Sequence, residues 1–201
     1  MRYPPDRKSK TRERILDAAA NLIRRQGIEE TGVDDVMKAA GLTAGGFYAH
    51  FRSKDALVTD AVDRAGQMSF RQWFAGLEEL HGSAFARALV ERYLSPEHRG
   101  DLEHGCILPT LGSEMARAKR PTRQRFERRL AGLIELIAQH TEAKSGPDRE
   151  RILATVALSI GGMVLSRAVN DRAFSDEILR ASRSGAHSLL GLTPRRRRRR
   201  P

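Results

Sequence analysis

Cysteine and aromatic residues are scarce in this sequence. Its 201 residues include one cysteine, Cys106, and only 5% are aromatic. A single cysteine excludes an intramolecular disulfide and is typical of a reducing compartment. The few aromatic residues, together with recurrent Ala, Leu and Arg, favour helices that pack through aliphatic side chains.

Long apolar segments are missing as well. The longest nearly apolar run, residues 156–165, would cover about half of a bilayer. No apolar core of a signal peptide follows the first six residues, which read MRYPPD. We therefore expect a soluble, cytoplasmic protein without a membrane partner.

The motifs of common enzymes are also absent. We find no phosphate-binding loop, no nucleophile motif and no paired catalytic carboxylates. The histidines lack metal-ligand spacing, and five of them are scattered widely: His81, His98, His104, His140 and His187. We expect no catalysis, no metal and no cofactor.

Positive charge exceeds negative charge, and much of the excess lies at one end. The formal net charge is +11, of which six charges lie in Arg195–Arg200 and five remain for the rest. Basic proteins favour polyanions such as nucleic acid or anionic lipid. Because like charges repel, we expect residues 193–201 to form a disordered tail that strengthens non-specific DNA binding in a salt-dependent way.

Apolar residues recur at helical spacing through most of the chain, and no segment shows the strict alternation of a strand. The stripe Ile15, Ala18, Ala19, Leu22 and Ile23 is one example. The sequence therefore predicts an all-α protein, with helices at about 10–26, 33–40, 44–51, 54–68, 83–94, 105–118, 122–143, 148–170 and 175–190.

Residues 33–54 have the pattern of a helix-turn-helix. One short amphipathic helix ends at Gly41, and a second begins after Thr43. Such a unit braces one helix on the DNA backbone while the next enters the major groove. Helical spacing turns Leu42, Phe47 and Phe51 inward. The outward face then holds Ala44, Gly45, Tyr48 and Ala49, with Gly46 and His50 beside it.

Two adjacent glycines, Gly45 and Gly46, lie in the second helix of this motif. Relative to alanines they cost about 2 kcal/mol of helix stability. Either the missing side chains let the backbone approach DNA closely, or a short, braced helix simply tolerates them.

The run from Gly41 to Asp55, GLTAGGFYAHFRSKD, resembles the signature of the TetR/AcrR family of bacterial regulators. The run RILDAAANLI from Arg14 and the later Leu57 also match. The resemblance covers about residues 10–60, and the remainder is similar by length and pattern only. It implies a mobile basic arm at 1–9, a DNA-binding domain at 10–60, and a helical ligand-binding and dimerisation domain at 61–192.

The family resemblance implies a homodimer that binds a near-palindromic operator, usually as a repressor that a small ligand releases. By the same resemblance, Tyr48, His50 and Lys54 match family positions that touch phosphates or base edges. Lys54 lies at a helix N-terminus, which itself attracts phosphate. For Tyr48 and His50, packing or capping within the chain remains an alternative. The residues expected to contact DNA are Thr31, Gly32, Thr43, Ala44, Gly45, Gly46, Tyr48, His50 and Lys54.

Two features depart from the family pattern. Gly32 stands where the family often has Ser or Thr, so one hydroxyl contact to phosphate is missing. The outward face also lacks Arg, Asn and Gln, which read bases with paired hydrogen bonds. We then expect specificity from Ala44 or Ala49 against thymine methyl groups, from Tyr48 and from DNA shape. Further contacts are expected from the arm: Arg2, Arg7, Lys8, Lys10 and Arg12.

The helices at 122–143 and 148–170 carry wide apolar stripes. These stripes either complete the core of one chain or form a two-fold four-helix interface, and the resemblance favours the dimer. The expected interface residues are Phe126, Leu130, Leu133, Ile137, Val156, Ala157, Ile160, Gly161 and Val164. We interpret the basic cluster at 117–129 as a solvated face rather than a second DNA site.

An effector pocket is expected among the central helices, although its identity is open. Candidates that are equally compatible with ordinary core are Trp73, Tyr93 and Met115. Cys106, preceded by His104, starts a predicted helix, where the dipole lowers a thiol pKa. The Gly-Cys pair also resembles a family branch that senses electrophiles, whereas the alternative is an inert, buried cysteine. For the chain as a whole, the competing interpretation is a protein that coats DNA without sequence specificity.

Overall fold

The computed structural model describes residues 5–141 and 148–192, which divide into two compact units. Unit 1 comprises the chain up to Trp73 together with Asp101–Gly132, and unit 2 comprises Phe74–Gly100 together with the chain from Leu133 onward. Every element within these described ranges is a helix. The predicted all-α fold is therefore confirmed.

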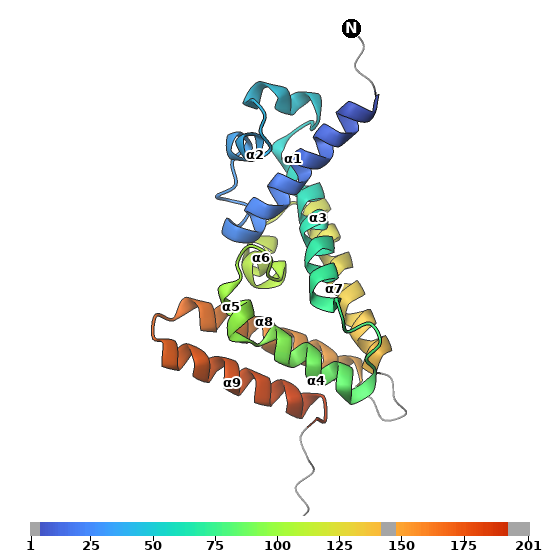
Figure 1. Ribbon diagram of the computed structural model, residues 1–201, viewed down its shortest axis with the longest axis vertical. Coiled ribbons are helices and arrows are strands. Elements are labelled where there is room, and N and C mark those ends of the chain that lie inside the picture. Colours follow the sequence, from blue (N-terminus) through green and yellow to red (C-terminus); the bar gives the residue numbers. More distant parts are fainter. Residues whose placement is uncertain (1–4, 142–147, 193–201) are drawn as a thin grey trace, which may run out of the picture. The chain divides into compact units, whose positions relative to one another are not determined.

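Unit 1 holds the helix-turn-helix. Its elements are α1 (Pro5–Gln26), α2 (Val33–Ala39), the 3₁₀ helix η1 (Ala44–Ala49), most of α3 (Lys54–Phe74), α6 (Ile107–Met115) and the first half of α7 (Arg120–Thr141). In Figure 1 these helices run from blue to green, with α6 and α7 in yellow-green and yellow. Unit 1 is thus larger than the expected domain at 10–60, because α6 and part of α7 pack with it.

The core of unit 1 is built mainly from apolar side chains. Ile15, Val36 and Val62 are fully buried, and Phe47 of η1 is 1% exposed. α6 adds Leu111 to the same cluster. Burying each such side chain stabilises the fold by about 1.5–3 kcal/mol, so this packing fixes η1 against the first two helices.

Unit 2 contains α4 (Gly82–Tyr93), the short α5 (Pro96–Gly100), the remainder of α7, α8 (Arg149–Ala168) and α9 (Arg172–Leu189). Figure 1 shows α9 beside α8 and α4, and both pairs are in contact. Asp148 caps α8 by accepting the Arg151 amide at 2.9 Å, and Asp171 caps α9 in the same way. These caps satisfy amides that a helix start leaves free.

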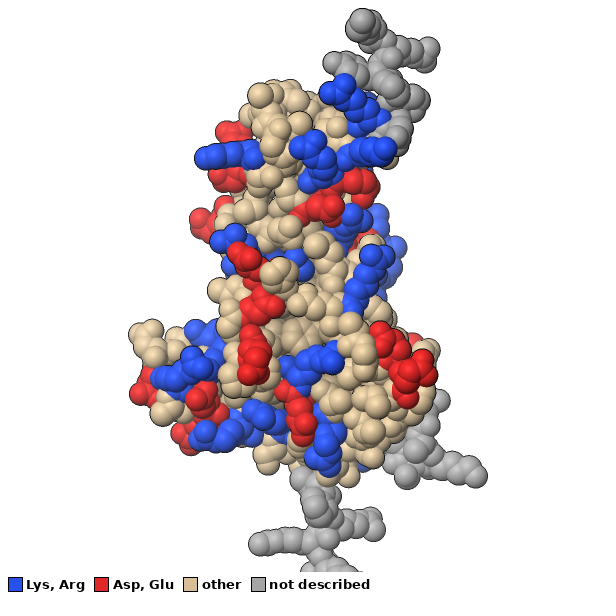
Figure 2. Space-filling model, viewed as in Figure 1, with Lys and Arg blue, Asp and Glu red and all other residues tan. Residues whose placement is uncertain are grey.

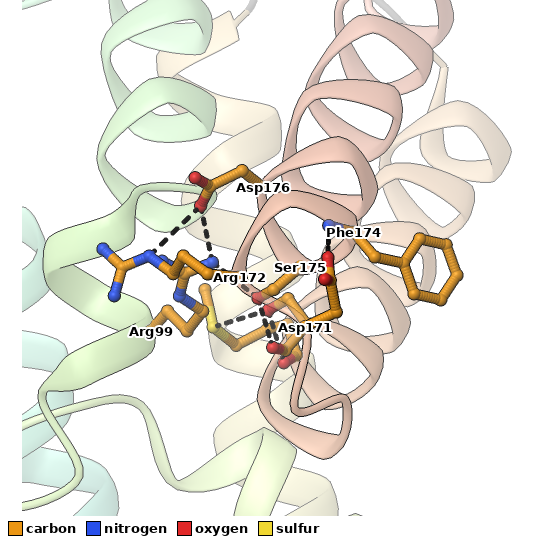
Figure 3. Close-up of polar contacts among 8 residues, drawn as sticks. Arg99, Asp171, Arg172, Phe174, Ser175 and Asp176 are labelled. Atoms are coloured by element: carbon orange, nitrogen blue, oxygen red, sulfur yellow. Dashed lines mark hydrogen bonds and ion pairs between the residues drawn. The ribbon is translucent and has the colours of Figure 1, made fainter.

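Unit 2 combines an apolar cluster, which includes Leu94, Met163 and Leu179, with buried polar contacts. Arg99, whose side chain is 8% exposed, donates through Nη1 to Ser175 Oγ at 2.5 Å and to Asp176 Oδ1 at 2.7 Å (Figure 3). Ser175 in turn donates to the Ser166 carbonyl at 2.5 Å. A buried charge needs such partners, so this cluster ties α5 to both α8 and α9.

Several boundaries differ from the predicted helices, among them the end of α3 at Phe74 rather than at residue 68. α1 begins at Pro5 rather than at residue 10, because proline suits the first helical turn; residues 5–9 of the expected arm are therefore helical. The segment expected at 44–51 is a 3₁₀ helix ending at Ala49, in keeping with the poor α-helix propensity of its two glycines. α7 begins at Arg120 and takes Pro121 into its first turn.

Candidate DNA-binding surface

The outward face of η1 is exposed as predicted. Thr43, Ala44, Gly45 and Ala49 are exposed, and Tyr48 is 78% exposed although its neighbour Phe47 is 1% exposed. The Tyr48 ring meets Phe47 edge-on, with centroids 5.2 Å apart. Phe47 therefore anchors η1 in the core, while Tyr48 projects from it.

Gly45 and Gly46 have different surroundings. A Cβ atom at Gly45 would meet nothing within 4 Å, whereas one at Gly46 would lie 3.6 Å from Met37 Cε. Neither glycine has a positive φ. The fold of the described chain therefore gives no steric reason for glycine at position 45.

His50 lies at the edge of this face and is half-buried. Burial lowers its pKa below the usual value, and the positive charges of Lys8 and Arg12 lower it further. Arg12 stacks over Phe51 at 4.6 Å and bonds Asp60 at 2.5 Å. The imidazole is therefore favoured in its neutral form in the free protein.

Two helices flank η1 in the sequence, α2 before it and α3 after it. Lys54 is the exposed first residue of α3, and the Ser53 hydroxyl accepts the Ala56 amide at 3.2 Å. Gly32 is the N-cap of α2 and offers no side-chain hydrogen bond. A phosphate near either start would meet free amides and the positive end of a helix dipole.

Thr31 does not belong to this surface. It is 3% exposed, and its hydroxyl donates to the Gly27 carbonyl at 2.6 Å. The sequence does not predict the burial of Thr31, because a threonine before a helix is typical of an exposed cap. We therefore remove Thr31 from the expected DNA contacts.

Charged side chains are arranged differently around η1 and in the basic cluster at 117–129. Uncharged side chains cover the end of unit 1 where η1 lies, with Lys and Arg beside them (Figure 2). In the cluster at 117–129, Lys119 bonds Asp55 at 2.6 Å, and both Arg125 and Arg129 pair with Asp63. These pairs support the interpretation of that cluster as a structural, solvated face. Arg2 and the tail at 193–201 lie outside the described residues.

Cys106 is the N-cap of α6 and is 9% exposed. Its Sγ accepts the Leu108 amide at 3.5 Å. His104 is turned to solvent and bonds Asp101, with Nδ1 and Oδ1 3.2 Å apart. Of the other effector candidates, Trp73 and the buried Met115 belong to unit 1, whereas Tyr93 belongs to unit 2 and packs against His98.

The residues expected at the dimer interface separate into two groups. On α7, Phe126 packs against the core of unit 1 and Ile137 is buried; Leu130 and Leu133 are half-buried. On α8, Ala157, Gly161 and Val164 are exposed, while Val156 and Ile160 are half-buried. Part of the α7 stripe thus packs within the chain, whereas Ala157, Gly161 and Val164 of the α8 stripe are exposed.

α9 supplies an exposed surface that the sequence analysis missed. Phe174 is 51% exposed, and Ala181, Ser184 and Ser188 are exposed on the same helix. The sequence pattern that could have predicted this surface is the recurrence of small residues along the helix that follows the Asp171 cap. α8 is long and apolar enough to cross a membrane by length and composition alone, a test that the core helix of a soluble protein also passes.

Comparison with known proteins covers both parts of the chain. The family model of bacterial regulatory proteins, tetR family, matches residues 15–61. The regulator AcrR of Shigella flexneri is 42% identical over 50 residues, which are 25% of this chain and 23% of that protein. An uncharacterized HTH-type transcriptional regulator of Mycobacterium tuberculosis is 30% identical over 172 residues, 80% of this chain and 86% of that protein.

NemR of Escherichia coli is similar in sequence and in fold. This protein, named a transcriptional repressor, is 25% identical over 138 residues, 66% of this chain and 67% of that protein. The crystal structure of its reduced form has a TM-score of 0.75 at 20% identity and covers 92% of this chain and 98% of that chain. Since the mycobacterial relative matches across both the helix-turn-helix and the helical remainder, this chain belongs to the TetR family of DNA-binding transcriptional regulators, which are not enzymes.

Proposed function

We propose that this chain is a cytoplasmic, homodimeric repressor that binds a palindromic operator through η1. The observation that carries this proposal is the exposed η1 face, where Tyr48 is 78% exposed on a helix anchored by Phe47. A large aromatic side chain held outward at a helix-turn-helix suits contact with a phosphate or a base edge. Residues 10–60 are the core of the DNA-binding part of this proposal, and 61–192 contain its effector and dimer functions.

The proposed contacts fall into two kinds. Thr43, Ala44, Gly45, Gly46 and Tyr48 would lie against the bases. Contacts to phosphate would come from Gly32, His50 and Lys54. Because none of the base-facing side chains makes paired hydrogen bonds, we expect much of the specificity to come from thymine methyl groups and from DNA shape.

The test starts by selecting bound sites from random duplex DNA. The variant Tyr48→Ala/Lys54→Ala should lose the shift of the selected operator, because it lacks both the projecting ring and the phosphate contact. Arg71→Ala, which removes an exposed charge from the last turn of α3, is the matched control and should bind normally. Unchanged binding by the double variant would remove η1 from the proposed site.

For the dimer we propose an interface of α8 and α9 rather than of α7 and α8. The exposed stripe of α8 contains Leu153, Ala157, Gly161 and Leu165, of which Leu165 is 57% exposed. α9 adds Phe174 beside small residues. Apolar and small residues on two adjacent helices suit a four-helix contact with the same surface of a second copy.

Sedimentation of a charged variant tests this interface. Leu165→Arg should produce a folded monomer, because an unpaired guanidinium on each side would be buried in the interface. Leu102→Arg, at a 49% exposed leucine outside α8 and α9, is the control and should remain dimeric. A Leu165→Arg protein that sediments as the wild type does would exclude α8 from the contact.

Release from DNA is proposed to follow binding of a small molecule or modification of Cys106. The thiol lies at the start of α6, is 9% exposed and caps the helix by accepting the Leu108 amide. An adduct on this sulfur would therefore compete with the cap and with the surrounding core. Trp73, Tyr93, Met115 and His104 remain candidates for contact with an effector.

Cys106→Ser distinguishes the two routes. With N-ethylmaleimide as the probe, the wild type should lose operator binding while Cys106→Ser keeps it, since serine caps the helix but does not react. If both proteins respond equally, or neither responds, Cys106 is not the sensor and release depends on a reversibly bound ligand.

A further inference from the structure

α6 holds the end of α1 at three places, all within unit 1. The Thr110 hydroxyl donates to the Arg24 carbonyl at 3.3 Å. One turn further along α6, Glu114 reaches the residues that follow α1. Beyond the helix, Arg117 pairs with Glu29 at 3.3 Å, although these side chains are 65% and 68% exposed. Pairs this exposed contribute little, so of the two contacts made beyond the end of α1 the one from Glu114 is the more important.

The Glu114 carboxylate accepts two backbone amides. The Ile28 amide donates to Oε2 at 2.9 Å and to Oε1 at 3.1 Å, and the Glu29 amide donates to Oε1 at 3.2 Å. Hydrogen bonds to an ionised acceptor are stronger than neutral ones. Two consecutive amides aimed at one carboxylate also fix the direction in which the chain leaves α1.

Gly27 permits this approach. It ends α1 with φ +85°, and a Cβ atom there would lie 2.8 Å from Glu114 Oε1. The glycine thus serves the turn and the carboxylate together. Any larger residue at position 27 would push Glu114 away from the amides.

The turn held by Glu114 leads directly to the helix-turn-helix. The Thr31 amide and hydroxyl donate back to Ile28 and Gly27, which closes the turn on itself. Gly32 then forms the N-cap of α2. Because α2 connects through Gly41 to η1, the orientation of the turn sets the orientation of the DNA-facing element.

We propose that Glu114 is a positioning residue for operator binding: its carboxylate fixes the turn between α1 and α2 to α6. α6, whose N-cap is Cys106, is thereby tied to the residues that lead into the helix-turn-helix. The inference rests on the proposed function, because it concerns the geometry in which η1 meets an operator.

The experiment compares Glu114→Ala with Glu29→Ala by fluorescence anisotropy on the selected operator and on bulk DNA of the same length. Glu114→Ala should raise the Kd for the operator about tenfold, equivalent to ~1.4 kcal/mol. Its Kd for bulk DNA should stay within about twofold, since the cations that contact phosphate are unchanged. Glu29→Ala keeps the backbone amide but loses the Arg117 pair, and should bind as the wild type does. Glu114→Gln keeps one oxygen acceptor and should fall between them.

Amide exchange in the wild type gives a second readout. The Ile28 and Glu29 amide protons should exchange no faster in the operator complex than in the free protein. If they exchange faster in the complex, or if Glu114→Ala binds the operator as tightly as the wild type does, the proposal is overturned. A wild type that does not prefer any operator over bulk DNA would instead overturn the proposed function. If Glu114→Ala does not fold, Glu114→Gln and the exchange measurement decide.

Discussion

Two glycine-containing helices in this protein use the missing side chain in opposite ways. In α8, a Cβ atom at Gly162 would overlap Ser182 of α9, with the Ser182 Cβ only 2.7 Å away. In η1, a Cβ atom at Gly45 would meet nothing within 4 Å. The chain itself therefore requires glycine at position 162 but not at position 45. The comparison suggests that the reason for Gly45 lies in something the chain binds.

A third glycine extends the comparison. Gly161, next to Gly162, faces outward on α8 and has open space around it. Gly112 on α6 is also exposed, with open space around it, and lies on neither proposed interface. Gly112→Ala is thus the control for the variants below and should stabilise the protein by up to about 1 kcal/mol without changing binding.

Gly162→Ala should have the largest effect on stability. Rotation of Ser182 does not remove its Cβ, so α8 and α9 must separate, at a cost of about 1–3 kcal/mol. Urea unfolding followed by circular dichroism measures this loss. A variant as stable as the wild type would show that the two helices adjust freely, and the contrast between the glycines would disappear.

Gly45→Ala should leave the fold intact or stabilise it by about 0.5–1 kcal/mol. If the backbone of η1 lies close to the bases, the added methyl group should weaken operator binding about tenfold, or ~1.4 kcal/mol. Anisotropy titrations on the selected operator provide the measurement. Equal or tighter binding would mean that Gly45 is merely tolerated in a short helix.

Gly161→Ala should have a smaller effect, confined to the association of two copies. The methyl group would enter the proposed α8–α9 interface, where small residues allow close approach, and should raise the dimer Kd about fivefold, or ~1 kcal/mol. Sedimentation over a range of concentrations reports it. If the variant and Gly112→Ala give the same dimer Kd, close approach at Gly161 is ruled out.

Lowering the pH should cause the smallest of the expected changes in the stability of the fold. Burial lowers the pKa of His187 from its usual value of 6.5, with contributions from Arg87 and Arg183 that outweigh that of Glu91. The unfolded chain then binds a proton that the folded chain does not, so stability is retained above about pH 6.5 and declines as the pH falls towards the folded pKa. His187→Gln should lose less stability than the wild type between pH 7.5 and pH 5.5 in thermal melts. An identical loss in both proteins would assign the acid sensitivity to other groups, such as His50.

The sequence predicted unit 1 better than unit 2, and the reason lies in their cores. Ile15, Ala19 and Ile23 of α1 repeat at helical spacing and are all fully buried, so both the helix and its buried face could be predicted. In unit 2 the contacts between α8 and α9 include Ser166, Ser175 and Gly162, which no hydrophobic period reveals. The sequence also does not show which residues of the α7 stripe pack within the chain, as Phe126 and Ile137 do.

The DNA-facing residues illustrate a similar limit. The outward direction of Tyr48 followed from the spacing of Phe47 and Phe51. The burial of Thr31 did not, because it depends on a hydrogen bond to Gly27 within a turn. The role of Glu114 depends on two segments 86 residues apart in sequence, and no local pattern marks that contact.

The 3₁₀ form of η1 affects how much sequence an operator half-site must specify. Six residues at a rise of about 2.0 Å per residue extend roughly 12 Å, against about 9 Å for an α-helix of equal length. Successive base pairs are about 3.4 Å apart, so this element spans three or four of them. With three residues per turn, Gly45 and Tyr48 share one edge, and a narrow edge of that kind makes contact along a line rather than over a broad face. The half-site should therefore have a short, strongly preferred centre and flanks where many substitutions are accepted.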